Sequence, residues 1–591
     1  MEKAADSGES DAEANDDHGT HPSRGYTLDP GFDANSGECI AYLAILVHIV
    51  CILYAIGFVK GVNGLQPAWL RKSASRSLGL YQGCNKHPRA HSILVPRTSN
   101  ATHRSILDFL GLLNAKRRSV TENSLIWSYL ESRLRNIVMQ VPNDDLPKLS
   151  GMLKYNSFVH LMDDNNLISQ IEQLLKRRND SMLLFGEPIV VKDNLAIRDV
   201  PYSNGSNLLQ GYAPSYTARA VELLQHHGAL LIGKTAMDEF GVGASTDAAL
   251  NPYSSKHVAG GSSGGSATAV AGGIVNIAIG TDTGGSIRLP AAYCGCIGYR
   301  PSYGLISRQG LSELAGRFDT VGICTRNVDD CIKTLLCIID EITQDCTDSK
   351  ASSKVILDLK SMLHNKDTLK QLKVASLDTE ILVSKGLLDP EMADNIRKVE
   401  LNLSKLGVNV VKVPPPELAK IARSYHIYVA AQMASNLQRF ADMQYHTQQQ
   451  HMSTEDMMSQ MYPDTRARMQ GGVDILQQGY DHENIFKETR DYIHGWMNKH
   501  SIFTDLSIML SPTSAHQAPL KRKTQRDCIK EDLYTTLAPF IGACAIAIPT
   551  GMGKDGLPLS AQFTSARFQD ALLLEAARAY LDHAGNLIPT N

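Results

Sequence analysis

The stretch from Gly260 to Gly298 constrains this chain more than any other segment. It contains two glycine turns that carry serine, GGSSGG at Gly260 to Gly265 and TGGS at Thr283 to Ser286. The small and apolar run between them predicts a tightly packed helix followed by a buried strand. Glycine allows backbone amides to approach another group closely. The segment therefore predicts two turns that present N–H groups and serine hydroxyls to a reacting carbonyl.

A lysine stands at the end of an apolar run upstream of these turns. The run Met182 to Lys192, MLLFGEPIVVK, is rich in β-forming residues and predicts a strand. A strand that ends in Lys192 can place an amine in a cleft of the core. Taken by itself, the run would favour a lysine at a strand edge in solvent.

A second lysine lies in a segment that matches a phosphate-loop expression. Residues Gly228 to Thr235, GALLIGKT, fit the pattern G-x-x-x-x-G-K-[ST]. In a phosphate loop the residues between the glycines form a turn whose amides face phosphate. Here they are Ala, Leu, Leu and Ile, which predict a short buried strand. We therefore expect no nucleotide binding through this segment.

The first hundred residues differ in composition from the rest. Residues 1–38 are acidic and predict a disordered extension, and 39–59 form an apolar run long enough to span a bilayer or to serve as a signal. Residues 60–104 contain no acidic residue and resemble an organelle transit segment. The order of these segments predicts two-step import into a plastid-type organelle. A mitochondrial location and a single-pass membrane anchor are the alternatives, and residues 105–591 form the globular part.

Charge and cysteine content exclude some other classes. The formal net charge of −3 gives no whole-chain electrostatic argument for binding nucleic acid. The eleven cysteines are an odd number and lie mostly in apolar segments, as Cys294, Cys296 and Cys544 do. They predict buried thiols instead of a disulfide framework.

Taken together, Lys192, GGSSGGSA and GTDTGGSIRLPAAYCG resemble the amidase signature family. The resemblance covers about residues 105–591. It implies an α/β fold in which a mixed, largely parallel central sheet is covered by helices in one large domain.

The resemblance also assigns a Ser-cisSer-Lys triad. Ser286 is the implied nucleophile, Ser262 the bridging serine after a cis peptide bond, and Lys192 the general base. A lysine can act as a base only when it is neutral, which requires burial. The family's oxyanion hole is made of backbone N–H groups, here those of Thr283, Gly284 and Gly285.

Other segments resemble one branch of this family, the A subunits of glutamyl-tRNA(Gln) amidotransferases. They include GKTAMDEF at 233–240, RPSYGLISRQGL at 300–311 and EDLYTTLAPFIGACAIAIP at 531–549. This resemblance implies glutamine as the substrate, with three substrate-binding residues: Arg468 for the α-carboxylate, Asp532 for the α-ammonium, and Tyr425. A register shift of two would replace Arg468 with Arg466.

The same resemblance implies partners. The ammonia released from glutamine would pass to a B-type subunit, which uses ATP and Mg²⁺ and holds the misacylated Glu-tRNA(Gln), while a small C-type subunit joins the pair. No metal or organic cofactor is expected in this chain. Two alternatives remain open: a membrane-anchored amidase of the fatty-acid-amide type, for which residues 39–59 would be the anchor, and a non-catalytic assembly subunit.

Overall fold

The computed structural model describes residues 155–177, 179, 181–339, 349–362, 372–442, 453–503, 507–521 and 528–585. The chain divides into two units, Met1–Pro96 and Arg97–Asn591, and every described residue lies in the second. The three predicted segments at 1–38, 39–59 and 60–104 lie outside the described residues. Among the helices that the structure describes, none is long and apolar enough to cross a membrane.

One mixed sheet of eleven strands runs through the described part of the second unit. Its strands, in spatial order, are β1 (Phe158–Leu161), β3 (Leu230–Thr235), β2 (Pro188–Lys192), β4 (Ile277–Asp282), β6 (Thr320–Thr325), β5 (Ile297–Arg300), β10 (Cys544–Met552), β11 (Pro558–Ser565), β9 (Ser507–Pro512), β7 (Lys373–Leu377) and β8 (Asn409–Val413).

The predicted α/β architecture with a mixed central sheet is confirmed, but the expectation that the sheet is largely parallel is wrong. Six of the ten strand pairings are antiparallel. The four parallel pairings are β2–β3, β2–β4, β7–β8 and β7–β9. Parallel neighbours need a long crossover, which α7 (Arg219–His226) supplies between β2 and β3. Strands β10 and β11 are joined by a short turn, which permits only antiparallel pairing.

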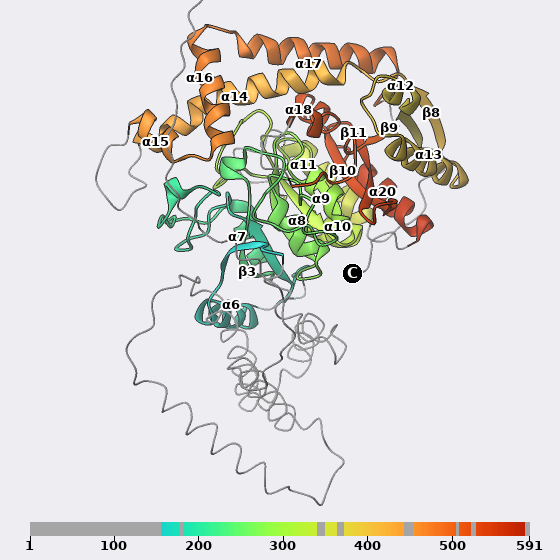
Figure 1. The fold of residues 1–591 in the computed structure, drawn as a ribbon. Coiled ribbons are helices and arrows are strands. Elements are labelled where there is room, and N and C mark those ends of the chain that lie inside the picture. The colour runs from blue at the N-terminus through green and yellow to red at the C-terminus, as the bar shows by residue number, and fades with distance from the viewer. Residues whose placement is uncertain are drawn as a thin grey trace, which may run out of the picture. The chain divides into compact units, whose positions relative to one another are not determined.

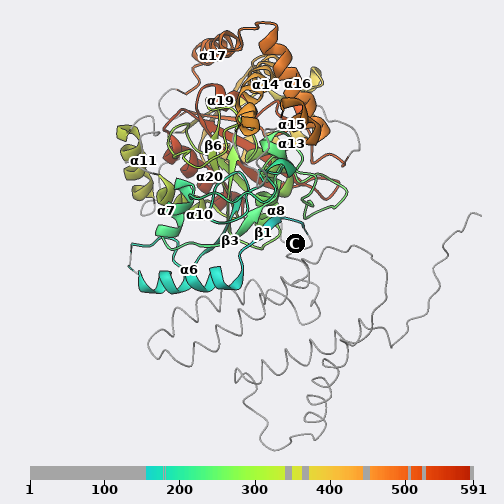
Figure 2. The ribbon, with the colours of Figure 1, turned by 90° about the vertical axis from the view of Figure 1, so that its left-hand side faces the viewer.

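Helices cover the sheet and extend beyond one end of it. Figures 1 and 2 both place α14, α16 and α17 together, far from α6 in this unit. The helices are α6 (Asp164–Lys176), α7, α8 (Gly264–Ala271), α9 (Arg288–Cys294), α10 (Val328–Ile338), α11 (Ser349–Met362), α12 (Thr379–Ser384), α13 (Pro390–Lys405), α14 (Leu418–Asp442), α15 (Thr454–Gln460), α16 (Pro463–Gln477), α17 (His482–Lys499), α18 (Cys528–Glu531), α19 (Leu537–Phe540) and α20 (Asp570–Ala584).

Strand β2 lies inside the sheet and is buried along its whole length. Ile189 and Val191 join a core cluster with residues of α7, α10 and α20, whereas Val190 packs with residues of α8 and α9. Because side chains alternate between the faces of a strand, Lys192 lies on the same face as Val190. The sheet therefore delivers this lysine toward the helices that follow the two glycine turns.

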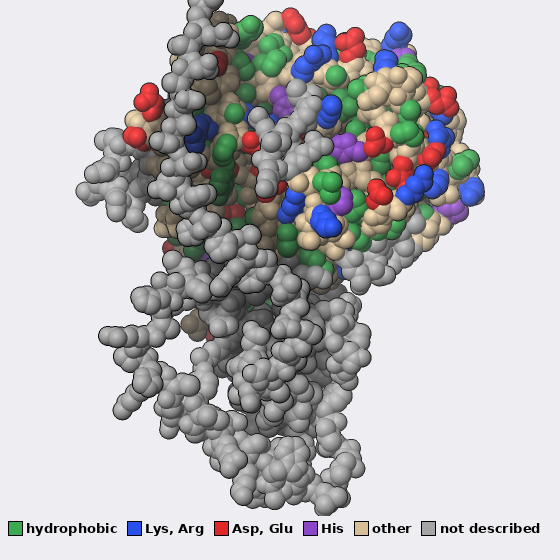
Figure 3. Space-filling model, viewed as in Figure 1, with side chains coloured by type: hydrophobic (Ala, Val, Ile, Leu, Met, Phe, Trp, Pro, Cys, Tyr) green, Lys and Arg blue, Asp and Glu red, His purple; other side chains and the backbone are tan. Residues whose placement is uncertain are grey.

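The surface carries charges of both signs. On the face shown in Figure 3, acidic and basic side chains are interspersed over the described residues. This distribution agrees with the small net charge of the whole chain. The predicted buried thiols are confirmed, since Cys294, Cys296 and Cys544 are free and buried.

Candidate active site

The structure brings the predicted base and the predicted bridging serine into contact. Lys192 is fully buried at the end of β2. Its Nζ lies 2.7 Å from Ser262 Oγ and 2.9 Å from Thr281 Oγ1. The amide of Asn194 also donates to Thr281 Oγ1, at 3.0 Å. The amine therefore has two hydroxyl partners, one of which sequence reasoning did not single out.

The electrostatic surroundings of Lys192 suit a base. Burial lowers its pKa from 10.5 to about 7, whereas the carboxylates of Asp238, Asp282 and Asp319 act in the opposite direction. Burial prevails because an ammonium loses its hydration inside the core. A pKa near 7 leaves a large share of the amine neutral at physiological pH, as general-base catalysis requires.

The first glycine turn lies against the second. The peptide bond between Gly261 and Ser262 is cis, as the resemblance implied. The next residue, Ser263, donates its backbone N–H to the carbonyl of Ser286 at 3.1 Å. Ser262 is almost fully buried, and Ser286 has an exposed fraction of 9%. The turn that carries the predicted bridging serine is thus tied to the backbone of the predicted nucleophile.

A buried carboxylate supports the first turn from behind. Asp238 accepts a hydrogen bond from the N–H of Thr246 at 2.6 Å, and Thr246 Oγ1 accepts one from the N–H of Gly264 at 3.1 Å. A Cβ on Gly261 would fall 2.0 Å from Asp238 Oδ2, so only glycine fits there. Burial raises the pKa of Asp238 to about 6. Nothing in the residue spacing indicates this support.

The second glycine turn is packed closely by two side chains. A Cβ on Gly284 would lie 2.3 Å from Tyr425 Cζ, and one on Gly285 would lie 2.3 Å from Thr535 Oγ1. Gly285 also has a φ of +152°, which side-chain-bearing residues rarely adopt. Within the described part of the chain, the N–H groups of Thr283, Gly284 and Gly285 donate no hydrogen bond. They are thus available to a substrate oxygen.

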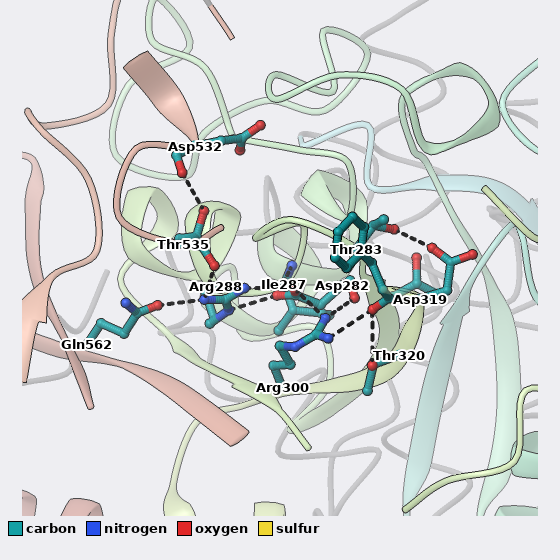
Figure 4. Close-up of polar contacts among 12 residues, drawn as sticks. Asp282, Thr283, Ile287, Arg288, Arg300, Asp319, Thr320, Asp532, Thr535 and Gln562 are labelled. Atoms are coloured by element: carbon teal, nitrogen blue, oxygen red, sulfur yellow. Dashed lines mark hydrogen bonds and ion pairs between the residues drawn. The ribbon is translucent and has the colours of Figure 1, made fainter. Parts of the chain in front are cut away.

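Asp319 holds the start of this second turn. Its Oδ1 accepts a hydrogen bond from Thr283 Oγ1 at 2.7 Å, which Figure 4 shows. Its Oδ2 accepts bonds from the N–H groups of Leu314 and Ala315, at 2.8 and 3.0 Å. Burial raises the pKa of Asp319 to about 6, although these hydrogen bonds favour the carboxylate.

Asp282 and Arg288 form a buried scaffold beneath the turn (Figure 4). Arg288 binds Asp282 through two nitrogens, at 2.9 and 2.8 Å, and donates to the carbonyl of Thr535 and to Gln562 Oε1, both at 2.8 Å. Arg300 Nη1 lies 3.0 Å from the same carboxylate. Burial by itself would raise the pKa of Asp282, but the two guanidinium groups hold it at about 2. This carboxylate is therefore ionised at physiological pH and neutralised by the two guanidinium groups.

Three residues predicted to bind the substrate lie close to one another. Tyr425 lies against Gly284, as described above. Burial raises the pKa of Asp532 to about 7, and Arg468 is near enough to lower it. Burial raises the pKa of Tyr425, Asp532 raises it further, and Arg468 lowers it. Asp532 also contacts His426, whose Nε2 is 3.5 Å from its Oδ2.

The structure distinguishes Arg468 from Arg466. Both lie in the first two turns of α16, but Arg466 is exposed and donates to the carbonyls of Ser459 and Met461, each at 3.1 Å. These carbonyls belong to the end of α15, so Arg466 has a local role. Arg468 is half-buried and lies close enough to Asp532 and Tyr425 to lower the pKa of both.

The phosphate-loop expression belongs to a strand, as expected. Residues Gly233 to Thr235 are part of β3, whose amides take part in the sheet. The ammonium of Lys234 lies 2.6 Å from Asp193 Oδ1 and 3.2 Å from the carbonyl of Pro201. It also lies over the ring of Tyr202, 4.5 Å from the centroid. This lysine is an internal structural cation. Among the described residues, no group of three or more histidine, cysteine and acidic residues could hold a metal ion.

Comparisons with known proteins agree on one family. The chain matches the family described as Amidase over residues 152–574. It is 30% identical to the A subunit of the glutamyl-tRNA(Gln) amidotransferase of Aliarcobacter butzleri, with 74% of this chain and 96% of that protein covered. The corresponding mitochondrial protein of Anopheles gambiae is 32% identical, with coverage of 74% and 92%. The crystal structure of the corresponding Thermotoga maritima protein superimposes with a TM-score of 0.58 at 25% identity, covering 76% of this chain and 93% of that one.

Proposed function

The chain belongs to the amidase family, and we propose that within this family it is the glutamine-hydrolysing A subunit of a glutamyl-tRNA(Gln) amidotransferase. The observation that carries the proposal is the contact of 2.7 Å between Lys192 Nζ and Ser262 Oγ, inside a core that lowers the pKa of the lysine to about 7. The choice of glutamine as the substrate rests on the similarity to these A subunits.

In the proposed reaction, neutral Lys192 takes the proton of Ser262 as Ser262 takes the proton of Ser286. Ser286 Oγ then bonds to the carbonyl carbon of the glutamine side chain, and the carbonyl oxygen becomes an oxyanion. The N–H groups of residues 283–285 stabilise this charge, each for about 3 kcal/mol in the transition state. The proton returns from Lys192 through Ser262 to the leaving nitrogen, the C–N bond breaks, and ammonia departs.

Water completes the cycle by the same route. A water molecule gives a proton to the Ser262–Lys192 pair as its oxygen attacks the glutamyl ester. The ester bond to Ser286 breaks, and the proton returns to the serine oxygen. Free glutamate is the product, and Lys192 is neutral again.

Recognition of glutamine is proposed to rest on opposite charges at its α-carbon. Arg468 suits the α-carboxylate, because a guanidinium can donate two parallel hydrogen bonds to it. Asp532 suits the α-ammonium. Burial raises the pKa of this carboxyl group to about 7, and the substrate cation would favour its ionised form. Tyr425 packs against the second glycine turn and is close enough to Asp532 and Arg468 for both to affect its pKa, so it would orient the side-chain amide.

The remaining elements of the proposal concern partners and location. We propose that the ammonia passes to a B-type subunit, which binds ATP, Mg²⁺ and the misacylated Glu-tRNA(Gln), and that a C-type subunit completes the complex. This chain would itself need no cofactor. We also propose an organellar location, which the mitochondrial relative supports; import into a plastid through residues 39–104 is the finer form of this proposal.

The test measures ammonia release by the full chain, purified together with the proteins that copurify with it. Glutamine is expected to be hydrolysed, a long-chain fatty amide is not, and Ser286→Ala should lower the rate more than about a thousandfold. A preference for the fatty amide would favour the membrane-anchored amidase. Glutamine-dependent amidation of Glu-tRNA that survives Ser286→Ala would favour a non-catalytic role in assembly. Either result would overturn the proposal.

A further inference from the structure

His426 lies beside the carboxylate proposed to hold the substrate ammonium, yet the reaction above gives it no role. Its Nε2 is 3.5 Å from Asp532 Oδ2, and the two side chains have exposed fractions of only 13% and 14%. His426 follows Tyr425 on α14, and Tyr425 lies against Gly284 of the second turn. The histidine thus reaches Asp532 from the same helix that faces the proposed oxyanion site.

Asp532 lies among charges of both signs. Burial raises its pKa to about 7 even though Arg468 and Arg288 act to lower it. A largely buried carboxylate in this condition is stabilised by any cation or hydrogen-bond donor that reaches it. The ionisable groups close enough to act on it come from α14, α16, α18, the end of β4 and the start of α9: Tyr425, His426, Arg468, Glu531, Asp282 and Arg288.

We propose that His426 relaxes the requirement for an α-amino group, by staying beside Asp532 whenever no α-ammonium is present and by giving way to the ammonium when glutamine binds. This inference rests on the proposed function, in which Asp532 holds that ammonium. An amide without an α-amino group leaves His426 in place, so the carboxylate keeps a partner. If His426 were absent, the same amide would leave a largely buried carboxylate unpaired, which is unfavourable.

Two consequences follow for the kinetics. Glutamine must displace His426 from Asp532, so removal of the imidazole should lower the KM for glutamine without changing kcat. An amide that lacks the α-amino group cannot satisfy Asp532, so the same change should lower its kcat/KM. His426 therefore reduces the discrimination between the two substrates.

The experiment compares glutamine with glutaramate, which lacks only the α-amino group, as substrates of the full chain and its copurifying partners. In His426→Leu the ratio of the two kcat/KM values is expected to rise about threefold, the effect of losing one charge contact that makes no hydrogen bond. His426→Gln keeps a neutral donor near Asp532 and should give a smaller rise. The KM for glutamine should fall in both variants.

His482→Leu is the matched control. His482 of α17 contacts Gln432 of α14, the helix that carries His426, with the two Nε2 atoms 3.2 Å apart. Its replacement should leave the ratio unchanged. A ratio that stays constant or falls in a folded His426→Leu protein would overturn the inference while ammonia release from glutamine still supported the function. If His426→Leu does not fold, His426→Gln decides by the same criterion. A wild-type chain that releases no ammonia from glutamine contradicts the proposed function itself.

Discussion

Replacing Lys192 with methionine should abolish hydrolysis and make the protein more stable at neutral and acidic pH. Methionine has a similar length and no charge. Burial lowers the pKa of this lysine from 10.5 to about 7 against the pull of nearby carboxylates. A change of this size corresponds to about 5 kcal/mol by which the folded protein disfavours the ammonium.

The sign of the effect depends on pH. Because the pKa is lower in the folded state, the unfolded chain binds more protons between pH 7 and 10.5, and the free energy of unfolding of the wild type rises with pH across that window. Below pH 7 the wild type bears the full penalty, and above pH 10.5 it bears none. The methionine variant bears none at any pH, but it leaves the hydroxyls of Ser262 and Thr281 without this partner, at a cost of about 1 kcal/mol each. The net gain at pH 6 is therefore about 3 kcal/mol.

Urea unfolding of both proteins at pH 6 and pH 9.5 measures this gain. The buried carboxylates titrate in both proteins, so the difference between the two reports the lysine together with its coupling to Asp238. Lys234→Met is the control, because this equally buried lysine is paired with Asp193 at 2.6 Å. That variant should be several kcal/mol less stable than the wild type, since it leaves a buried carboxylate unpaired. A methionine at position 192 that destabilises the protein at pH 6, or whose effect is independent of pH, would refute the reasoning.

Three further substitutions probe the rest of the site. Gly284→Ala should lower kcat at least about tenfold in steady-state kinetics, because the new Cβ would meet Tyr425 Cζ at 2.3 Å. Adding Tyr425→Ala should restore part of the lost activity. Asp282→Asn should lower the free energy of unfolding by about 3 to 5 kcal/mol, measured in urea, since it leaves two buried guanidinium groups without their carboxylate. An unchanged midpoint would contradict the scaffold role. Arg468→Ala should raise the KM for glutamine about tenfold or more with kcat retained, whereas Arg466→Ala should change it less than twofold; the reverse pattern would move the role to Arg466.

Local sequence was sufficient for the elements that surround the glycine turns. The small residues of α8 and the apolar run of β4 predicted a helix and a strand, and both form. The strand character of GALLIGKT was also evident, because four adjacent apolar residues cannot form a phosphate-binding turn. These predictions succeeded because each depends on residues that are neighbours in the chain.

Predictions that depend on distant segments were weaker. The direction of the strands in the second half follows from how β9, β10 and β11 pair, and apolar patterns do not encode strand direction. The support that Asp238 and Asp319 give to the turns was missed for a similar reason. Each comes from a different loop, and neither stands at a spacing that marks it out. Thr281 was within the motif, but only the geometry of β2 and β4 shows that its hydroxyl meets Lys192.

The depth of β2 in the sheet is what makes Lys192 suitable as a base. Of the three carboxylates that favour its ammonium, Asp282 is neutralised by Arg288 and Arg300, so its influence on the lysine is reduced. Asp238 and Asp319 accept hydrogen bonds from backbone N–H groups, and burial raises the pKa of each to about 6. Because the opposing charges are weakened in this way, desolvation prevails and the amine is largely neutral near pH 7. The same lysine at an exposed strand end would remain an ammonium and could not accept a proton from serine.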